Sequence, residues 1–298
     1  CHQDVLALAI TSPVTVTYTF TRLSNGNVIN TGTTPGSFNF TATNAKEGYY
    51  EIGITNSFGC ILKDTIYLLV NPLPNPIATA TPNPICQGGS LQLGVNGGNN
   101  FGFAWSGPNG YTSNVKNPVI NGILPSASGV YTVTVTNLNG CSDTSSVSVL
   151  VNPTPTAVAT PASQTICSAA SISTIVLSGA VSGTTYAWTR DNAVAVTGIA
   201  ASGSGNISGS LTNTTNAPVT VTFTITPTAN GCPGAAITAT VLVNPTPNAV
   251  ATPASQTICS ATSISTIVLT GAVSGTTYAW TRNNTASVTG IAASGSGN

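Results

Sequence analysis

The stretch GVYTVTVTNLNGC, residues 129–141, decides the fold of this chain. From Tyr131 to Val135 apolar side chains alternate with threonine, which is the period-two pattern of a β-strand with one buried face. The Asn-Leu-Asn-Gly that follows is typical of a hairpin turn, in which glycine supplies a positive φ. Residues 129–141 are therefore predicted to form a long strand and a turn that ends at a cysteine.

The same pattern returns elsewhere in the chain. Residues 48–60 (GYYEIGITNSFGC) match it position for position, and residues 219–232 are a looser third copy. A second phrase, Val-Asn-Pro-x-Pro, recurs at residues 70–74, 151–155 and 243–247, with spacings of 81 and 92 residues. Such spacings exceed the roughly 20–50 residues of solenoid repeats and suit one β-sandwich of about 100 residues each. Because proline donates no ladder hydrogen bond, this phrase is predicted to be a linker.

The fold class is therefore predicted to be all-β, with tandem immunoglobulin-like β-sandwich modules arranged as an elongated rod. Module 1 covers residues 1–71 and lacks its first strand, module 2 covers 72–152, and module 3 covers 153–244. Module 4, residues 245–298, is the N-terminal part of a further module, so the chain is expected to be a fragment of a longer repeat array.

Residues 152–206 and 244–298 are nearly the same sequence. They differ at seven of 55 aligned positions, and every exchange is between small or isosteric residues. The exchanged pairs are Thr156/Asn248, Ala170/Thr262, Ser178/Thr270, Asp191/Asn283, Ala193/Thr285, Val194/Ala286 and Ala195/Ser287. An active site is normally built once, whereas copied modules provide reach, spacing or multivalent contact. The duplication therefore favours a mechanical role.

Charged residues are scarce. They make up 4% of the chain, against about 25% in ordinary soluble proteins. Because the chain has no basic patch, nucleic-acid binding is disfavoured. Because it has few charges, its surface is expected to respond little to ionic strength. No apolar run approaches the ~18 residues of a membrane span, so no membrane insertion is expected. This composition suits a protein exposed to an uncontrolled outside medium.

An aromatic-x-aromatic phrase marks a middle strand of each module. Its second aromatic is predicted to be buried in the hydrophobic core, like the tryptophan of strand C in immunoglobulin folds. A sugar-stacking platform is the alternative, and it would require an exposed ring. The four predicted core aromatics are Phe20, Trp105, Trp188 and Trp280. Arg22, Arg190 and Arg282 follow the phrase in three modules and are expected to be solvated at strand ends, with contact to a ligand as the alternative.

Seven cysteines fall into two classes. The leading cysteines, which come first in each module, are Cys1, Cys86, Cys167 and Cys259. The hairpin cysteines, which follow the predicted turn, are Cys60, Cys141 and Cys232. One of each class per module, without a CxxC motif, favours disulfides over metal and implies an oxidising compartment. The partner of Cys259 is expected outside the fragment.

The sequence leaves the disulfide connectivity open. Pairing within modules, Cys1–Cys60, Cys86–Cys141 and Cys167–Cys232, is preferred because it suits self-contained domains. In a strict immunoglobulin topology, however, the two cysteines would lie at opposite ends of a sandwich, beyond the reach of a disulfide. Pairing between modules, as in Cys1–Cys141 and Cys86–Cys232, is the alternative.

No catalytic device is found. His2 is the only histidine, so neither a Ser-His-Asp nor a Cys-His arrangement can recur in the repeats. The carboxylates are scattered, and Asp191 is replaced by Asn283 in the second copy. No clustered carboxylates of a calcium loop occur. The chain is therefore predicted not to be an enzyme, with no catalytic, cofactor-binding or metal-binding residues.

The modules resemble the PKD-like and immunoglobulin-like repeats of giant cell-surface proteins of Bacteroidetes, in particular the SprB-like gliding-motility adhesins. The resemblance is carried by residues 86–93, Trp105-Ser106, residues 129–141 and residues 151–155, together with the ATPASQTIC motifs at 159–167 and 251–259.

This resemblance implies type IX secretion, display on the outer membrane, and a filament that supports cell adhesion and gliding motility. The implied partners are neighbouring modules, surface polysaccharide or the substratum, and the motility or secretion machinery of the outer membrane. Asp64-Thr65-Ile66 fits the O-glycosylation pattern of that phylum, with Thr65 as the acceptor. The alternatives are a glycan-binding module and an accessory stalk of a secreted polysaccharide-degrading enzyme.

Overall fold

The structure is a computed structural model that describes residues 5–11, 15–41 and 46–297. The chain forms two compact units, Cys1–Asn152 and Pro153–Asn298, which are described separately. The helical structure of the described residues is limited to Lys46 and the two 3₁₀ turns Pro108–Gly110 and Pro125–Ala127, and the other regular structure is β-strand. The prediction of an all-β chain of tandem sandwich modules is confirmed.

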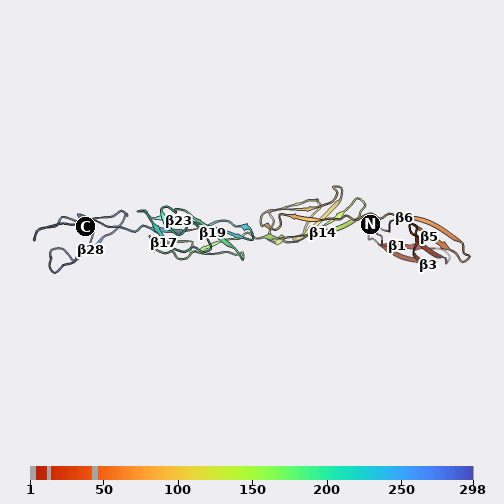
Figure 1. The fold of residues 1–298 in the computed structure, drawn as a ribbon, viewed down its shortest axis with the longest axis horizontal. Coiled ribbons are helices and arrows are strands. Elements are labelled where there is room, and N and C mark those ends of the chain that lie inside the picture. Colours follow the sequence, from red (N-terminus) through yellow and green to blue (C-terminus); the bar gives the residue numbers. More distant parts are fainter. Residues whose placement is uncertain (1–4, 12–14, 42–45, 298) are drawn as a thin grey trace. The chain divides into compact units, whose positions relative to one another are not determined.

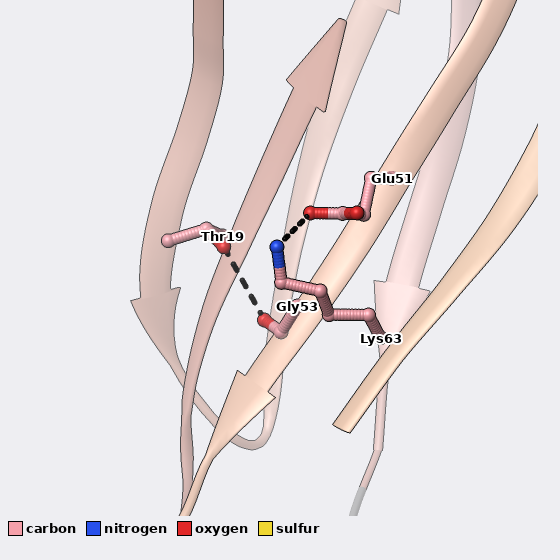
Figure 2. A network of polar contacts seen from close by, with 4 residues as sticks. All are labelled: Thr19, Glu51, Gly53 and Lys63. Carbon is pink, nitrogen blue, oxygen red and sulfur yellow. Dashed lines mark hydrogen bonds and ion pairs between the residues drawn. The ribbon is translucent and has the colours of Figure 1, made fainter. Parts of the chain in front are cut away.

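Module 1 contains two antiparallel sheets. Strand β1 (Val5–Ile10) pairs with β4 (Gly36–Thr41), and a four-stranded sheet has the order β3 (Asn27–Thr33), β2 (Thr17–Arg22), β5 (Gly48–Thr55), β6 (Ile61–Leu68). Its core is small and centres on the stacked rings of Phe20 and Tyr50. On β5 and β6, Glu51 Oε1 and Lys63 Nζ form an ion pair of 2.7 Å, and Thr19 Oγ1 donates to the Gly53 carbonyl (Figure 2).

Module 2 is a sandwich with its core between two sheets. One sheet has the order β11 (Tyr111–Ser113), β10 (Gly102–Gly107), β13 (Gly129–Thr136), β14 (Ser142–Val149), and the other has β12 (Val119–Asn121), β9 (Ser90–Val95), β7 (Ala78–Thr81). The alternating apolar residues of β9 and β13 face each other around Trp105. A short parallel pair, β8 (Ile85–Cys86) with β15 (Val151–Asn152), closes the end beside the linker.

Module 3 has the largest core. Its main sheet has the order β17 (Ser163–Cys167), β25 (Ile237–Asn244), β23 (Val219–Ala229), β19 (Thr185–Arg190), β21 (Ser202–Ser204), with β24 (Cys232–Pro233) paired to β23 (Figure 1). Two pairs complete the module: β16 (Val158–Thr160) with β18 (Val176–Ser178), and β20 (Val196–Gly198) with β22 (Leu211–Asn213). Fifteen buried apolar residues fill the core, from Ala159 to Val243.

Module 4 consists of two short pairs, β26 (Val250–Thr252) with β27 (Val268–Thr270) and β28 (Ala279–Thr281) with β29 (Ser294–Ser296). None of the buried apolar clusters of the described residues includes a residue after Val243. Instead, an open hollow of about 600 Å³ is lined by Ile264, Leu269, Trp280 and Ile291. The apolar side of this module is therefore uncovered.

Candidate functional site

Cys86 and Cys167, the leading cysteines of modules 2 and 3, lie at the linker end of their modules. In module 2, β8 runs parallel to β15, so that Cys86 is level with Asn152 of the linker phrase. In module 3, β17 runs parallel to β25, and Cys167 is level with Asn244 of the next linker phrase. The same register in both modules places each leading cysteine beside the linker that leaves its module.

The hairpin cysteines are held by the predicted turn. In module 2 the Asn137 side-chain oxygen accepts from the backbone N–H groups of Asn139 and Cys141, both at 3.0 Å, and Gly140 has φ 78°. Asn56 repeats these contacts with Phe58 and Cys60 in module 1. In module 3 the turn is shorter, because Asn230 and Gly231 both have positive φ and form a two-residue hairpin loop.

The hairpin end of module 2 contacts the preceding linker. The side chain of Asn137 donates through Nδ2 to the Pro72 carbonyl at 2.8 Å, and the buried Cys141 sulfur lies 3.8 Å from the Asn71 carbonyl. In module 3 a Cβ added to Gly234, two residues after Cys232, would overlap the Pro155 carbonyl. In both modules the hairpin cysteine therefore lies near the linker that enters the module.

The six described cysteines differ in state. Cys86, Cys141 and Cys232 take part in disulfides, whereas Cys60, Cys167 and Cys259 are free and exposed thiols. The preferred pairs Cys1–Cys60 and Cys167–Cys232 are therefore wrong. Cys1 itself lies outside the described residues.

Strand length explains why module 3 is not bridged internally. Its strand β23 pairs Val219 with Val243 at the end that holds Cys167, and pairs Ala229 with Cys232 at the other end. Ten residue steps of β-strand span about 33 Å. A disulfide needs Cα atoms within about 7 Å. The two cysteines of the module are therefore at opposite ends of the sheet.

The same reasoning excludes the pair Cys86–Cys141. The antiparallel pair β13 and β14 extends from Thr136–Ser142, next to Cys141, to Gly129–Val149, three residues before Asn152. Seven strand steps already span about 23 Å. Because Cys86 lies level with Asn152, it cannot reach Cys141. The third within-module pair is therefore wrong as well.

Three of the four predicted core aromatics, Phe20, Trp105 and Trp188, are buried. Such rings cannot stack on a sugar. The Trp188 indole packs edge-on against Phe223, and Gly203 passes so close that any Cβ there would overlap the indole. Trp280 is only partly buried, because the strands that cover Trp188 have no counterpart in the described part of module 4.

The arginines are not solvated strand-end cations, contrary to the expectation from sequence. The Arg190 Nε donates to the carbonyls of Ile199 and Ala200 at 2.8 and 3.1 Å, and Nη1 donates to Val196 at 3.0 Å. Burial lowers the pKa of Arg190, an effect opposed by Asp191. The side chain thus braces its own loop.

The other two arginines also bind backbone carbonyls. Arg282 makes the equivalent bonds to Val288, Ile291 and Ala292 in module 4. Arg22 donates through Nη2 to the Glu47 carbonyl in module 1 at 2.9 Å. Recurrence of an arginine after the aromatic phrase could have indicated this structural role.

A tyrosine corner, which is typical of immunoglobulin-like sandwiches, recurs in two modules. The hydroxyl of Tyr131 donates to the Ala127 carbonyl at 3.0 Å, and that of Tyr50 donates to the Lys46 carbonyl. Burial raises the pKa of both tyrosines. Tyr111 raises the pKa of Tyr131 further, whereas Arg22 opposes the rise at Tyr50. Its signal in the sequence is a tyrosine ten positions before Cys60 and before Cys141.

Module 3 has Phe223 at the corresponding register position, opposite the strand of the core tryptophan, and no corner hydroxyl there. Module 3 instead has a buried asparagine, Asn213, whose side chain forms hydrogen bonds with the backbone. Its Nδ2 donates to the carbonyls of Ala217 and Val243 at 2.7 and 2.8 Å, and its side-chain oxygen accepts from the Thr215 backbone.

The described carboxylates all serve the fold. Besides Glu51, which pairs with Lys63, Glu47 accepts from the Tyr67 hydroxyl, and Asp191 accepts from the backbone of β23 at Thr222. Asp64 and Asp143 each accept the next backbone N–H. Thr65 is exposed on β6.

The described residues contain no group of three His, Cys, Asp or Glu side chains that could hold a metal ion. Within the same part of the chain, no helix has the length and apolarity to span a membrane.

Comparison with known proteins gives a family match for one part of the chain. Residues 164–247, which lie in modules 3 and 4 and include most of module 3, match the family model of a PKD-like domain. No curated protein sequence matches the chain significantly.

Several solved structures resemble the chain. Three domains of the bacteriophage RB49 outer capsid protein Hoc are 16% identical, with a TM-score of 0.42, covering 82% of this chain and 95% of that one. The amphioxus IgVJ-C2 molecule is 16% identical, with a TM-score of 0.24, covering 50% and 97%. Murine CEACAM1b is 14% identical, with a TM-score of 0.31, covering 56% and 100%.

Because these TM-scores are below 0.5, the fold assignment rests on the strand topology and on the family match. PKD-like and immunoglobulin-like domains are typical of non-catalytic, extracellular-type repeat modules. The strand topology and the matched segment are those of a PKD-like or immunoglobulin-like repeat.

Proposed function

We propose that this chain is a non-catalytic segment of a long extracellular surface adhesin filament, similar to the SprB-like gliding-motility adhesins of Bacteroidetes. The modules would give reach and multivalency during attachment and gliding. A strand as long as β23, with 11 residues, corresponds to about 36 Å of reach per module. The four modules would follow the boundaries expected from the linker phrases.

One observation carries this proposal: the chemistry-bearing side chains are used to hold the modules together. Arg190 and Arg282 brace equivalent loops, and the described carboxylates bind backbone groups, a tyrosine or a lysine. What is copied between residues 152–206 and 244–298 is therefore a structural unit. Neighbouring modules are the partners that this architecture requires.

The proposal extends to export and display. Type IX secretion and display on the outer membrane, with contacts to surface polysaccharide and to the motility machinery, follow from the resemblance of the repeats. O-glycosylation of Thr65 is compatible with its exposure on β6.

Immunogold labelling of intact cells tests this function. Antibodies raised against the purified chain are applied to the cells that produce the full-length protein, with a strain lacking the gene as control. We expect label on filaments outside the cell, and reduced attachment and gliding in the deletion strain. Label that appears only after the cells are permeabilised would contradict the proposal.

A second candidate function, glycan binding, is favoured by one exposed aromatic pair. Tyr49 and Tyr67, on β5 and β6, are 59% and 52% exposed, with ring centroids 4.8 Å apart in an edge-on arrangement. Exposed rings of this kind can stack on sugars. A glycan array separates the candidates: binding that Tyr49→Ala and Tyr67→Ala abolish, and that the control Phe58→Ala retains, would establish it.

A further inference from the structure

One surface of module 1 carries side chains that the other modules lack at the same place. In β5, Tyr50 is buried in the core, so its neighbours Tyr49 and Glu51 lie on the opposite, outer face of the sheet. The register of β5 with β6 places Tyr67 opposite Tyr49 on that face. Lys63 lies four residues before Tyr67, so it is also on the outer face. Two tyrosines and two oppositely charged side chains therefore share one surface.

The equivalent positions in modules 2 and 3 hold small side chains. The strand pair β13–β14 of module 2 and the pair β23–β25 of module 3 correspond to β5–β6. Where module 1 has Tyr49, Tyr67, Glu51 and Lys63, module 2 has Val130, Ser148, Thr132 and Thr144, and module 3 has Thr222, Thr240 and Thr224 at the first three. Because modules 2 and 3 form their sandwiches without these four side chains, the fold does not require them.

The four side chains are held in defined positions. Lys63 Nζ and Glu51 Oε1 form the 2.7 Å ion pair that crosses from β6 to β5 (Figure 2). The Tyr67 hydroxyl donates to Glu47 Oε1 at 2.9 Å, and the Tyr49 ring lies edge-on to the Tyr67 ring. Side chains that are ordered in this way lose little conformational entropy when a ligand binds.

The same side chains remain accessible to a ligand. The Lys63 side chain is 59% exposed and that of Glu51 is 23% exposed, and both tyrosines are more than half exposed. The ion pair engages one carboxylate oxygen and one ammonium N–H, so a second oxygen and two N–H donors can bind the hydroxyl groups of a ligand. The four residue steps between Lys63 and Tyr67 span about 13 Å, which is more than the width of one sugar ring. The surface therefore suits a chain of sugars.

The charges beside the tyrosines disfavour an anionic ligand, because the two carboxylates of Glu47 and Glu51 accompany one ammonium, that of Lys63. We propose, building on the glycan-binding candidate function, that the outer face of β5 and β6 binds a neutral polysaccharide. Tyr49 and Tyr67 stack on pyranose rings, and Glu51 and Lys63 bind hydroxyl groups of the adjoining sugar. Among the modules whose equivalent strands are described, only module 1 has this site.

Isothermal titration calorimetry with the full chain tests the class of sugar. The probes are the neutral hexasaccharides cellohexaose, mannohexaose and chitohexaose, together with anionic hexagalacturonate and cationic hexaglucosamine. We expect a neutral probe to bind one site per chain, with the same affinity in about 0.05 M and about 0.5 M salt, because no net charge is neutralised. Failure of every neutral probe to bind, or tighter binding of a charged one, would overturn the proposal.

Substitutions on the outer face test the assigned contacts. Tyr67→Ala should weaken binding of the neutral probe by about tenfold or more, because it removes a stacking ring. Glu51→Ala and Lys63→Met should each weaken binding by about three- to tenfold, because each removes hydrogen bonds to the sugar hydroxyls. Val130→Ala, at the position in module 2 that corresponds to Tyr49, is the matched control and should leave the affinity unchanged.

The outcomes separate this site from glycan binding in general. If only Tyr49→Ala and Tyr67→Ala reduce the affinity, glycan binding stands and the roles assigned to Glu51 and Lys63 are wrong. Hydrogen exchange of β2 and β5 in each variant checks that module 1 stays folded, as expected because exposed ion pairs contribute little to stability. Immunogold labelling of filaments, which tests the adhesin function, should be the same for all variants.

Discussion

Residues 152–206 and 244–298 have almost the same sequence, but only the first copy has a buried core. Ile175 and Val196 are 0% exposed, whereas their counterparts Ile267 and Val288 are 37% and 60% exposed. Strands β22, β23 and β25 follow the first copy and cover its apolar side. The described residues after the start of the second copy include no counterpart of these strands. Burial is therefore decided by residues outside the duplicated segment.

Local structure is nevertheless the same in both copies. Trp188 is level with Gly203, and Trp280 is level with Gly295. The glutamine side chains of Gln164 and Gln256 each exchange two hydrogen bonds with a serine nine residues later. Contacts between residues close in sequence therefore form without a core.

Strands that depend on distant partners differ between the copies. Residues 163–167 form β17 because they pair with β25, whereas residues 255–259 have no strand structure. Residues 196–198 form β20 through β22, and residues 288–290 form no strand. Identical sequence thus gives a strand only where a partner supplies the ladder hydrogen bonds.

The largest expected effect comes from giving the second copy its missing cover. A chain extended after Asn298 by a repeat of residues 207–244 should bury four side chains: Ile264, Ile267, Val288 and Ile291. Full burial of an exposed side chain is worth about 1.5–3 kcal/mol, and these four are 37–60% exposed, so their burial adds roughly 3–5 kcal/mol, to which the cover over Leu269 and Trp280 contributes further. Hydrogen exchange should then slow throughout residues 245–298. A scrambled extension of equal composition is the control, and equal exchange in the two chains would contradict the expectation.

Removal of the core tryptophan should affect the two copies unequally. Trp188→Ala should lower the free energy of unfolding of module 3 by about 3–5 kcal/mol, because it leaves a cavity in a filled core. Trp280→Ala should cost less than about 1 kcal/mol in module 4, since the indole is only partly covered. Hydrogen exchange of β19 and β23, compared with that of β28, measures both. Equal losses would show that the second copy has a core after all.

Removal of the arginine brace should have a smaller effect. Arg190→Met retains the apolar stem but loses the bonds to Val196, Ile199 and Ala200, and should destabilise module 3 by about 1.5–3 kcal/mol. Arg190→Lys should restore little, because an ammonium lacks the planar fork of donors. Hydrogen exchange of β19 and β23 in increasing denaturant measures this change. A fully stable Arg190→Lys variant would show that charge alone suffices.

The smallest expected effect comes from removing the hydroxyl of a tyrosine corner, which module 3 does not have. Tyr131→Phe should cost about 1 kcal/mol for the hydrogen bond to Ala127. The folded-state pKa of Tyr131 is raised above its ordinary value of 10.0, so folding favours the protonated phenol. Its contribution is therefore complete below pH 10 and decreases as the pH rises through the folded-state pKa.

Denaturant unfolding between pH 8 and 11, with module 2 followed by hydrogen exchange, checks this pH dependence. Tyr131→Phe should flatten the alkaline loss of stability in module 2. An unchanged pH profile would exclude the corner phenol as its source. Module 3, with Phe223 at that position, serves as the internal comparison.

Much of the fold could be predicted from local sequence. The alternation in residues 129–141 and the Asn-x-x-Gly turn depend on neighbouring residues, and both form as expected. The burial of Phe20, Trp105 and Trp188 follows from their position in the alternation. Recurrence of the arginines could have indicated a structural role, but not their carbonyl partners, because these are presented by loop conformations that no pattern encodes.

Sequence by itself determined the alternating pattern of the strands, the turns, the repeat and the two classes of cysteine, because each depends on side-chain type and short-range spacing. Only the tertiary structure decided which cysteines can pair, since about 33 Å of sheet separates Cys167 from Cys232. Tertiary structure also decided which copy has a core. Hydrophobic burial needs a second apolar surface, and the sequence of residues 244–298 cannot supply one for itself.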